Sequence, residues 1–597
     1  MTLIDVIESY DRLIKQEKEK LTILKSNIFK IGTLRLIVVI TAFFIGYILW
    51  GNTLAVVAGT IAFIAIYLCL MVYHNRLFWR KKHSEILIQN ALNELNGLNY
   101  DFSAFDGAPE KSDASHSFSF DLDMFGNRSF FQSINRTVTD YGKEQLVKTI
   151  LQPLDNKNEI INRQEAIKEL VNKPELVTRF LAKGMMVENR DLDIKNFPEQ
   201  FNKSKSISST FWRFMPFIAP ILFTILIILN ILNILQGTYL ILGYSLLLIL
   251  ALIPLKYIKD KVSFLSRKVD TLKSFSRLFA IIESESFESN ELKQIQQTVK
   301  NNKNASKAIG QLKAYSDNLD QSFNVAGFLL LNPFLFWNVI YTHKIEKWIT
   351  KYENDIELWF DALAEFDSLI SLARFAYNHP DYNYPEVTDK FIFDGKALGH
   401  PMLHRDVCVR NDVTIKKRPF FLVVTGANMA GKSTYLRTVG INHTLACIGA
   451  PVCAESLIFY PSHLVTNLRT SDSLNDNESY FFAELKRLKM IIDRLQSGEE
   501  LFIILDEILK GTNSEDKQKG SIALMKQLVS LDGNGIIATH DLLLGELEKE
   551  YPDAIKNYRF EADIKDDHLT FSYKIREGVA QNMNACFLMK KMGITGL

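Results

Sequence analysis

The chain has 597 residues and a net charge of +1, with 69 Lys and Arg against 68 Asp and Glu. This length is enough for roughly three to five domains, and the balanced charge excludes a global field that would draw the whole chain to nucleic acid. Five cysteines are scattered without a C-x-x-C pair, which argues against a disulfide framework or a zinc site and fits a reducing compartment.

At the N-terminus, apolar residues recur at helical spacing among many charges, which predicts an amphipathic helix over residues 1–30. The charges are of both signs, so the apolar face favours a partner helix over a membrane surface. The same residues hold no apolar core of the length that a cleavable signal peptide needs.

Two long uncharged segments follow, and they predict two transmembrane hairpins over residues 31–75 and 211–257. Residues 36–73 and 214–255 contain no charged side chain, and a short polar turn divides each segment near its middle. Each half is close to the ~20 residues that an α-helix needs to span a bilayer. A buried pair of soluble helices would show polar residues on one side, so we favour four membrane spans.

Basic residues flank these spans on one side only, because the two short loops within the hairpins contain no Lys or Arg. The positive-inside rule therefore places all the soluble parts of the chain in the cytoplasm. The flanking basic residues are Lys25, Lys30, Arg35, Arg76, Arg80, Lys81, Lys82, Lys203, Lys205, Arg213, Lys256, Lys259, Lys261, Arg267 and Lys268.

Outside the hairpins, the pattern up to residue 385 is largely helical. We predict a connector over residues 76–124 and a helical core and lever domain over 125–385, which the second hairpin interrupts. Within this domain, Val325–Tyr341 is apolar but contains Asn332-Pro333. A fifth span would move the rest of the chain to the other side of the membrane, so we interpret this run as a buried helix of the soluble domain.

From residue 386 to 597 strands and helices alternate, which predicts an α/β nucleotide-binding domain. Helices lie between most of the strands. The predicted strands are Phe391–Phe393, Phe420–Thr425, Leu501–Leu505, Ile536–Thr539, Tyr558–Ala562 and Leu569–Ile575.

The second of these strands is followed by a phosphate-binding loop of the pattern G-x-x-x-x-G-K-[ST] and then by a helix. The glycines let backbone N–H groups point inward at an anion, and the helix N-terminus adds a positive dipole end. Lys432 is expected to reach the outer phosphates, and the Ser433 hydroxyl to ligate Mg²⁺. The loop consists of Gly426, Ala427, Asn428, Met429, Ala430, Gly431, Lys432, Ser433 and Thr434.

Two further strands end in polar residues that suit ATP hydrolysis. One runs into Asp506, which can hold Mg²⁺ through its shell, and Glu507, which can orient or deprotonate the attacking water. The other ends at His540, which we expect beside the same site as a sensor of the γ-phosphate. The sequence therefore predicts a Mg²⁺-dependent ATPase. An ATP site requires the cytoplasm, which agrees with a multi-pass protein of the inner (cytoplasmic) membrane.

These motifs carry a resemblance to the MutS family of DNA mismatch-repair ATPases. It rests on Thr425–Thr434, Asp506–Asn513 and Ala538–His540, with a weaker likeness over Arg136–Leu170. The resemblance implies an α/β P-loop ATPase domain of MutS/ABC type after an all-α core and lever domain. It also implies that Ser479 acts on the γ-phosphate bound by a partner subunit, and hence a homodimer through paired ATPase domains.

The sequence departs from the family pattern in several places. Only about thirty residues precede the first span, so we expect no mismatch-reading N-terminal domain, and no G-x-F-Y-E-like wedge is found. The second hairpin lies where the family carries its DNA clamp. Leu509 replaces a glycine, and no aromatic residue lies between Val407 and Arg410 to stack on the adenine.

Three functions remain open from the sequence. The first is a membrane-anchored MutS-like ATPase that binds DNA, with the basic run Lys256–Arg277 as a candidate phosphate contact; such a run is also the expected flank of a membrane span. The second is a mechanochemical membrane ATPase whose client is not DNA. The third, a transporter, is least favoured because no span contains a charged residue and no L-S-G-G-Q loop is found.

Overall fold

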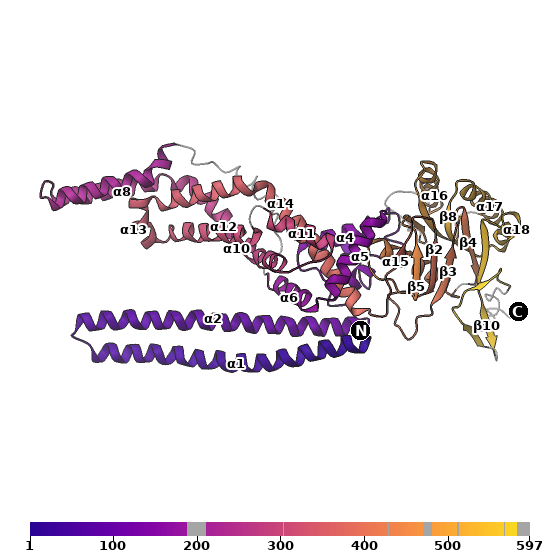
Figure 1. Ribbon diagram of the computed structural model, residues 1–597, viewed down its shortest axis with the longest axis horizontal. Helices are drawn as coiled ribbons and strands as arrows, with labels where there is room; N and C mark the ends of the chain where they lie inside the picture. Colours follow the sequence, from indigo (N-terminus) through magenta and orange to yellow (C-terminus); the bar gives the residue numbers. More distant parts are fainter. Residues whose placement is uncertain are drawn as a thin grey trace.

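The computed structural model describes residues 1–187, 210–301, 304–427, 429–469, 480–509, 513–565 and 568–581. The molecule is elongated, with a mixed α/β domain at one end, a helical domain in the middle and two helical projections at the other end (Figure 1). The helices α1 and α2 form one projection, and α8 with its neighbours forms the other.

The first projection is a hairpin of two unbroken helices, α1 (Leu3–Ile48) and α2 (Thr53–Leu98), each of 46 residues. Each helix is about 69 Å long at ~1.5 Å per residue, which is much more than a bilayer core of about 30 Å. Residues 1–30 are thus the start of the same helix as the first apolar run. The structure also differs from the predicted connector at 76–124, because α2 continues to Leu98 and so occupies the first part of that segment.

A polar contact joins the two helices where their apolar runs begin. The Arg35 guanidinium donates to the Tyr67 hydroxyl at 2.7 Å and lies 2.9 Å from Nδ1 of His74. Beyond this contact, the most apolar 18-residue stretch of each helix has no buried residue. The apolar side chains of this projection therefore face away from the rest of the protein.

The second projection contains three helices, α8 (Thr210–Ile231), α9 (Gly237–Leu252) and α13 (Val325–Leu335). α13 packs against both α8 and α9, and its Val325 and Leu330 side chains are 74% and 69% exposed. Our interpretation of this run as a buried helix of the soluble domain is therefore wrong. Composition alone cannot separate an apolar helix that is covered by protein from one that is left open.

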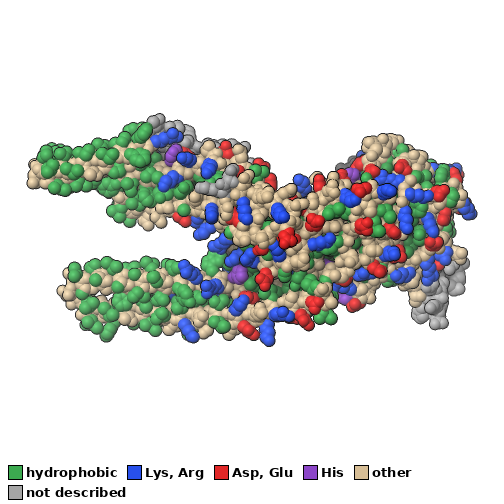
Figure 2. Space-filling model, viewed as in Figure 1, with side chains coloured by type: hydrophobic (Ala, Val, Ile, Leu, Met, Phe, Trp, Pro, Cys, Tyr) green, Lys and Arg blue, Asp and Glu red, His purple; other side chains and the backbone are tan. Residues whose placement is uncertain are grey.

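By length and composition, three helices among the described residues can cross a membrane, namely α1, α2 and residues 211–231 of α8. The pair α13 and α14 bends by 81° and gives a fourth if it counts as one span, whereas α9 has only 16 residues. Apolar side chains cover the outer parts of both projections in Figure 2, and charged side chains gather over the rest of the molecule.

The helical domain lies around the long helix α14 (Trp337–Asn378), whose second half is almost entirely buried. Its aromatic core includes Phe360, whose ring meets Phe275 and Phe279 edge-on at centroid distances of 5.2 and 5.5 Å. The other helices here are α3 (Phe130–Ile134), α4 (Asp140–Leu151), α5 (Lys157–Val171), α6 (Pro174–Met185), α10 (Leu255–Ser284), α11 (Asn290–Lys300) and α12 (Ala305–Gln321).

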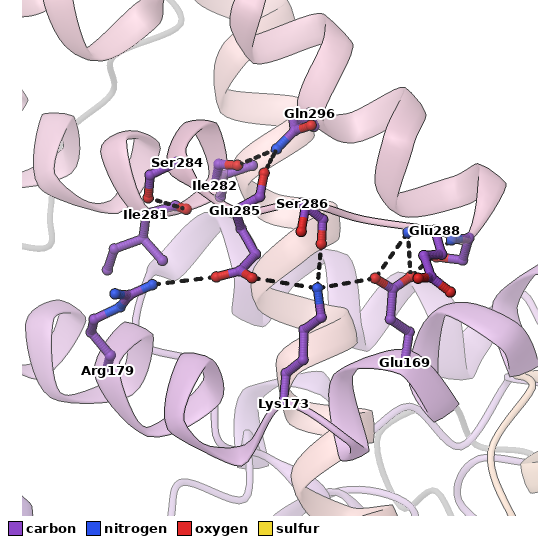
Figure 3. Close-up of polar contacts among 11 residues, drawn as sticks. Glu169, Lys173, Arg179, Ile281, Ile282, Ser284, Glu285, Ser286, Glu288 and Gln296 are labelled. Atoms are coloured by element: carbon purple, nitrogen blue, oxygen red, sulfur yellow. Dashed lines mark hydrogen bonds and ion pairs between the residues drawn. The ribbon is translucent and has the colours of Figure 1, made fainter.

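Polar contacts hold the end of α10 against α5 and α6 (Figure 3). Glu285 lies 3.4 Å from Lys173 and 3.5 Å from Arg179. The Gln296 amide donates to two carbonyls at the end of α10, at 2.7 and 2.6 Å, and so satisfies groups that a helix end leaves without a partner. Because α10 begins directly after the second hairpin, these contacts tie that hairpin to the helical domain.

A buried polar network joins the first hairpin to the end of α14, and we call it the hairpin-base network. Glu94 of α2 accepts from Arg136 at 2.9 Å and from Asn378 at 2.8 Å, and the Glu94 and Arg136 side chains are 0% and 4% exposed. Tyr10 of α1 donates to Asn378 at 2.7 Å and accepts from Arg374 at 3.0 Å. Each side chain in the network is thus paired with another.

The α/β domain is built on a six-stranded sheet with the order β12-β9-β4-β8-β7-β6. β4 pairs with β8 and β8 with β7, all parallel and all apolar and buried, as expected for a sheet covered on both faces. Its strands are β4 (Phe420–Gly426), β6 (His463–Asn467), β7 (Leu501–Asp506), β8 (Asn534–Thr539), β9 (Ile555–Phe560) and β12 (Arg576–Glu577).

A second sheet, with the order β1-β5-β2-β3, and the pair β10-β11 complete the strands. The predicted strand at 558–562 is divided between β9 and β10, and the one at 569–575 becomes β11 and an irregular segment. The remaining elements are β1 (Glu386–Val387), β2 (Phe393–Leu398), β3 (Asn411–Ile415), β5 (Ser456–Phe459), β10 (Ala562–Lys565), β11 (His568–Phe571), α15 (Lys432–Cys447), α16 (Tyr480–Gln496), α17 (Ser514–Ser530), α18 (Leu547–Glu550) and the short 3₁₀ helices η1 (Pro109–Lys111) and η2 (Leu542–Glu546).

The connector after α2 is irregular, and it is fixed to the α/β domain. Asp121, which is buried, accepts from the Thr466 hydroxyl of β6 at 2.6 Å. Arg487 of α16 donates to the Ser117 carbonyl at 2.6 Å. This segment therefore links the first hairpin to the edge of the sheet that carries the candidate site.

Candidate active site

The predicted phosphate loop lies between β4 and α15, where the chain turns sharply. Gly426 and Gly431 have φ values of +150° and +107°, which side chains with a Cβ rarely adopt. A Cβ on Gly426 would lie 2.4 Å from the Phe560 carbonyl oxygen of β9. Both glycines are therefore required by the backbone path that brings the loop over the end of the sheet.

Lys432, at the start of α15, is folded back onto this loop. Its Nζ donates to the Gly426 carbonyl at 2.6 Å and to the Ala427 carbonyl at 3.1 Å, and the residue is only 5% exposed. A buried ammonium group is costly without partners, and these carbonyls provide them. The charge is thus held at the centre of the loop.

Ser433 and Asp506 meet across the sheet, as the sequence predicted. The Ser433 hydroxyl donates to Asp506 Oδ2 at 2.6 Å. Ser433 follows β4 and Asp506 ends β7, and only β8 lies between these strands. The carboxyl ends of parallel strands share one edge of a sheet, so residues 73 positions apart in the chain become neighbours.

Glu507 and His540 form the second half of the site. Oε1 of Glu507 lies 2.6 Å from Nε2 of His540, which in turn lies 3.4 Å from Nζ of Lys432. Glu507 has a φ of +51°, and its N–H donates to the Ala538 carbonyl of β8 at 2.9 Å. A left-handed backbone at a residue other than glycine is uncommon and often marks a functional position.

Leu509 has the left-handed backbone conformation that favours glycine, the residue that is usual here in the family. Its φ is +59°, and its N–H donates to the buried carboxylate of Glu484 in α16 at 2.6 Å. The side chain has room because Gly520 of α17 lies beneath it, where a Cβ would come within 2.6 Å of Leu509 Cδ1. This departure from the family pattern is thus compensated in the structure.

A cavity of about 520 Å³ opens beside Lys432 and Ser433. One wall is formed by the loop and by the start of α15. A second wall is formed by His400, Leu403, Val407, Val409 and Tyr573. His400 belongs to the segment Gly399-His400-Pro401, whose sequence also resembles the MutS family.

Tyr573 is the aromatic residue that sequence reasoning missed. We predicted no aromatic partner for an adenine between Val407 and Arg410, and none lies there. Instead the Tyr573 ring reaches the cavity from the segment after β11, where Asn411 fixes its backbone by accepting from Ile575 N–H at 3.0 Å and donating to the Tyr573 carbonyl at 2.9 Å. The only sequence signal was its place in the second half of the predicted strand Leu569–Ile575.

His400 gives the same wall a neutral imidazole. Burial, together with the nearby Arg437, lowers the pKa of His400 to about 4. The ring therefore carries no charge at neutral pH and adds a flat, weakly polar surface beside the apolar side chains.

Two predicted site residues, Asn428 and Ser479, lie outside the described residues. Of the other loop residues, Ala430 is buried and Met429 is exposed at a φ of +68°. Thr434 lines the cavity. The structure thus brings together every described residue of the predicted site.

Two family models match the chain. MutS domain III matches residues 115–373, and MutS domain V matches residues 422–593. The chain belongs to the MutS family. The second hairpin, at 211–257, lies within the segment that matches MutS domain III, and α1 and α2 precede it.

Curated MutS-family relatives share part of this chain. MutS protein homolog 4 of Homo sapiens is 30% identical over 234 residues, which are 38% of this chain and 24% of that protein. DNA mismatch repair protein MutS of Thermotoga maritima is 30% identical over 236 residues, 39% of this chain and 29% of that protein. DNA mismatch repair protein MSH4 of Arabidopsis thaliana is 34% identical over 201 residues, 33% of this chain and 25% of that protein. The matches therefore span about a quarter of the length of these relatives.

Proposed function

We propose that this MutS-family chain is a Mg²⁺-dependent ATPase anchored in a membrane. The observation that carries the catalytic part is the convergence of five side chains at the ends of β4, β7 and β8, two of which, Lys432 and Ser433, line the cavity. Together they offer a cation for phosphates, two oxygen ligands for a metal, and a carboxylate paired with an imidazole, which are the parts that phosphoryl transfer to water needs. They are Lys432, Ser433, Asp506, Glu507 and His540.

In this proposal the phosphates lie on the loop Gly426–Thr434, and Lys432 exchanges its carbonyl contacts for the outer phosphate oxygens. The adenine lies against the wall that includes Val407 and Tyr573, since an aromatic ring offers a base a stacking partner. The cavity adjoins both groups, so one ligand with a base and a phosphate chain can reach them together.

The oxygen pair of Ser433 and Asp506 fits Mg²⁺, which prefers oxygen ligands and takes one or two protein ligands beside phosphates and water. Among the described residues, no group of three or more His, Cys, Asp or Glu side chains forms a metal site. When bound, Mg²⁺ neutralises charge on the phosphates.

Glu507 is assigned to orient or deprotonate the attacking water, and His540 to sense the γ-phosphate. Their 2.6 Å contact fixes the carboxylate and the ring relative to each other. The 3.4 Å distance from His540 to Lys432 supports a common position of both groups beside the outer phosphate. A change at that phosphate can therefore reach the catalytic carboxylate through one side chain.

We also propose that both projections lie in the inner (cytoplasmic) membrane, with four spans and with the ATPase domain in the cytoplasm. The exposed apolar side chains of α1, α2 and α8 support insertion (Figure 2). α13 adds a further apolar surface beside α8 and α9. Extraction of membranes with carbonate and protease protection of the α/β domain test this arrangement; release of the chain by carbonate contradicts it.

DNA is the first candidate client, in a mismatch-repair-like role. The support is family membership, and two of the relatives above are named DNA mismatch repair proteins. Three basic side chains of the run Lys256–Arg277 that we considered as a phosphate contact, those of Lys259, Lys261 and Arg267, lie outside the described residues.

The second candidate is a client in the membrane, and the position of the second hairpin favours it. This hairpin lies inside the MutS domain III match, and α10 connects it directly to the helical domain. A movement of that domain on nucleotide binding would therefore be passed to the membrane helices.

One assay separates these candidates. The ATPase rate of the purified chain is measured in detergent and in liposomes, each with no DNA, with duplex DNA and with duplex DNA carrying a mismatch. Stimulation by DNA at low salt supports the first candidate, and stimulation by liposomes without an effect of DNA supports the second. The absence of Mg²⁺-dependent hydrolysis in all conditions would falsify the ATPase proposal itself.

Paired ATPase domains form the last part of the proposal. The support is the resemblance, because Ser479 lies outside the described residues. Glu507→Gln should hold ATP without hydrolysis and so favour the homodimer. The mass of that variant in solution, with ATP and with ADP, tests this; an unchanged monomer mass with ATP contradicts pairing.

A further inference from the structure

We propose that a basic cleft at the base of the first hairpin binds the phosphate-bearing headgroup of an anionic phospholipid. The cleft has a volume of about 570 Å³ and lies between α1, α2 and α6. The proposal rests on the membrane anchoring proposed above. We call this site the basal cleft, and its argument uses Glu17, Lys20, Leu77, Arg80, His83 and Lys183.

The basal cleft lies at the depth where lipid headgroups would be. The uncharged part of α2 ends at Tyr73, which lines the cleft, and Arg80 follows seven residues later. Seven residues of helix rise about 10 Å, slightly more than the roughly 5–8 Å by which the headgroup region extends beyond the hydrocarbon core, and a long arginine side chain can reach back over the difference. Tyr73 and Trp79, both 47% exposed, are residue types that concentrate at this boundary.

The charges that line the cleft are mainly positive. Lys20, Arg80 and Lys183 face one carboxylate, that of Glu17, which is already paired with Lys20 at 2.5 Å. Among the described residues, no carboxylate lies within ion-pair distance of Arg80 or Lys183. The cleft therefore holds more positive charge than its own acidic group can balance.

Neighbouring groups add to this imbalance. The Arg277 guanidinium of α10 stands over the Trp79 ring at 4.8 Å. Burial lowers the pKa of Lys183 and Arg277 lowers it further, and burial and then Lys183 lower the pKa of His83. A bound anion relieves this repulsion, because opposite charge favours the protonated form of each base.

The cleft also has an apolar side, formed by Ile23, Leu24 and Leu77. Leu77 lies between Arg80 and the uncharged part of α2, which ends at Tyr73. A free phosphate ion would use only the basic side. A phospholipid uses both sides, with its phosphate near Arg80 and Lys183 and its acyl chains along the helices, so we commit to the lipid.

The test compares lipid retention by the full-length protein and by two variants with equal loss of charge. Arg80→Gln/Lys183→Gln removes two cleft cations, and Lys25→Gln/Lys30→Gln removes two exposed cations of α1 outside the cleft. Native mass spectrometry counts bound phosphatidylglycerol and phosphatidylcholine after purification in each lipid. We expect preferential retention of phosphatidylglycerol, about a tenfold weaker retention in the cleft variant, and no change in the control variant.

Three results would overturn the lipid site. They are equal retention of both lipids by the unaltered chain, equal loss in the two variants, and binding of inorganic phosphate without retention of phosphatidylglycerol. Melting curves and ATPase rates of both variants show whether each is folded. Flotation with phosphatidylcholine vesicles tests anchoring separately. If the chain floats but shows no lipid preference, the proposed membrane anchoring stands and the proposed lipid site is wrong.

Discussion

Two polar networks in this protein have similar chemistry and opposite surroundings. The hairpin-base network and the candidate active site each pair carboxylates with polar or basic side chains drawn from distant parts of the chain. In the first, Glu94 and Arg136 are sealed from solvent. In the second, Lys432 and Ser433 border a cavity of about 520 Å³.

The difference teaches what each network can do. Groups that are buried and fully paired hold segments together, and removing one partner leaves a charge without compensation. Groups that border a cavity can exchange their protein partners for a ligand. We therefore expect substitutions in the hairpin-base network to affect stability, and substitutions in the site to affect turnover or nucleotide binding with little effect on stability.

The largest effect is expected at Glu507. Glu507→Gln removes the base but keeps the size of the side chain, so ATP turnover should fall by about 10²- to 10⁴-fold, with little change in melting temperature. Steady-state ATPase rates measure this, and Glu515→Gln, an exposed site in α17, serves as the matched control. Near-normal turnover in Glu507→Gln would remove the role assigned to this carboxylate.

In the hairpin-base network, a substitution should lower the stability of the protein. Arg136→Met leaves Glu94 buried and without its guanidinium partner, so the free energy of unfolding should fall by about 3–5 kcal/mol. Thermal melting of the detergent-solubilised protein measures this. The double variant Glu94→Leu/Arg136→Met should recover part of the loss, because no isolated charge remains; if it melts as low as the single variant, the ion pair is not the cause.

Lys432→Ala should weaken ATP binding by about 10- to 100-fold, because hydrogen bonds to charged groups contribute about 1.5–3 kcal/mol. Equilibrium binding of a fluorescent ATP analogue measures this. Lys519→Ala removes a lysine that is 74% exposed and should bind as the unaltered chain does. A large fall in melting temperature for Lys432→Ala would show that its carbonyl contacts matter for folding, against the contrast drawn above.

Tyr573→Ala tests the wall of the cavity. Loss of a ring that stacks on a base costs about 1–3 kcal/mol, so ATP binding should weaken by about tenfold, whereas Tyr573→Phe keeps the ring and should bind normally. The same binding assay applies. If both variants bind ATP normally, the adenine does not lie against this residue.

The smallest effect is expected from pH at the end of the helical domain. His379 follows Asn378 of the hairpin-base network, and burial lowers its pKa to about 4, below its ordinary value. The unfolded chain therefore takes up a proton first, so stability is lost as pH falls below about 6.5, by about 1.4 kcal/mol at pH 5.5. Melting at pH 7.5 and pH 5.5 measures the loss of stability, and His379→Gln should reduce that loss. If the pH dependence of the variant equals that of the unaltered chain, His379 is not its cause.

The strongest parts of the fold and the site could be predicted because they depend on local pattern. β4, β7 and β8 are continuous apolar runs, and such runs between turns indicate buried parallel strands. The polar residues that follow them then meet at one sheet edge, which brings Ser433 to Asp506 and Glu507 to His540. Short strands with polar residues, such as β3 and β6, gave no such signal and were missed.

The remaining parts depend on contacts between distant segments. Tyr573 reaches the cavity only because Asn411 of β3 fixes its backbone. Leu509 fits where a glycine was expected because Gly520 leaves it space. α13 was placed in the soluble core because composition does not tell which surface covers an apolar helix.

By itself, the sequence determined the phosphate loop, the two carboxylates, the histidine and the two uncharged hairpins. Each of these features follows from residue spacing or composition within a short stretch of the chain. Only the tertiary structure decided that α1 and α2 run unbroken into the helical domain, that Tyr573 faces the cavity, and that Glu94 and Arg136 are buried together. These features arise from packing between segments that are far apart in the chain, and no local sequence pattern indicates which segments will meet.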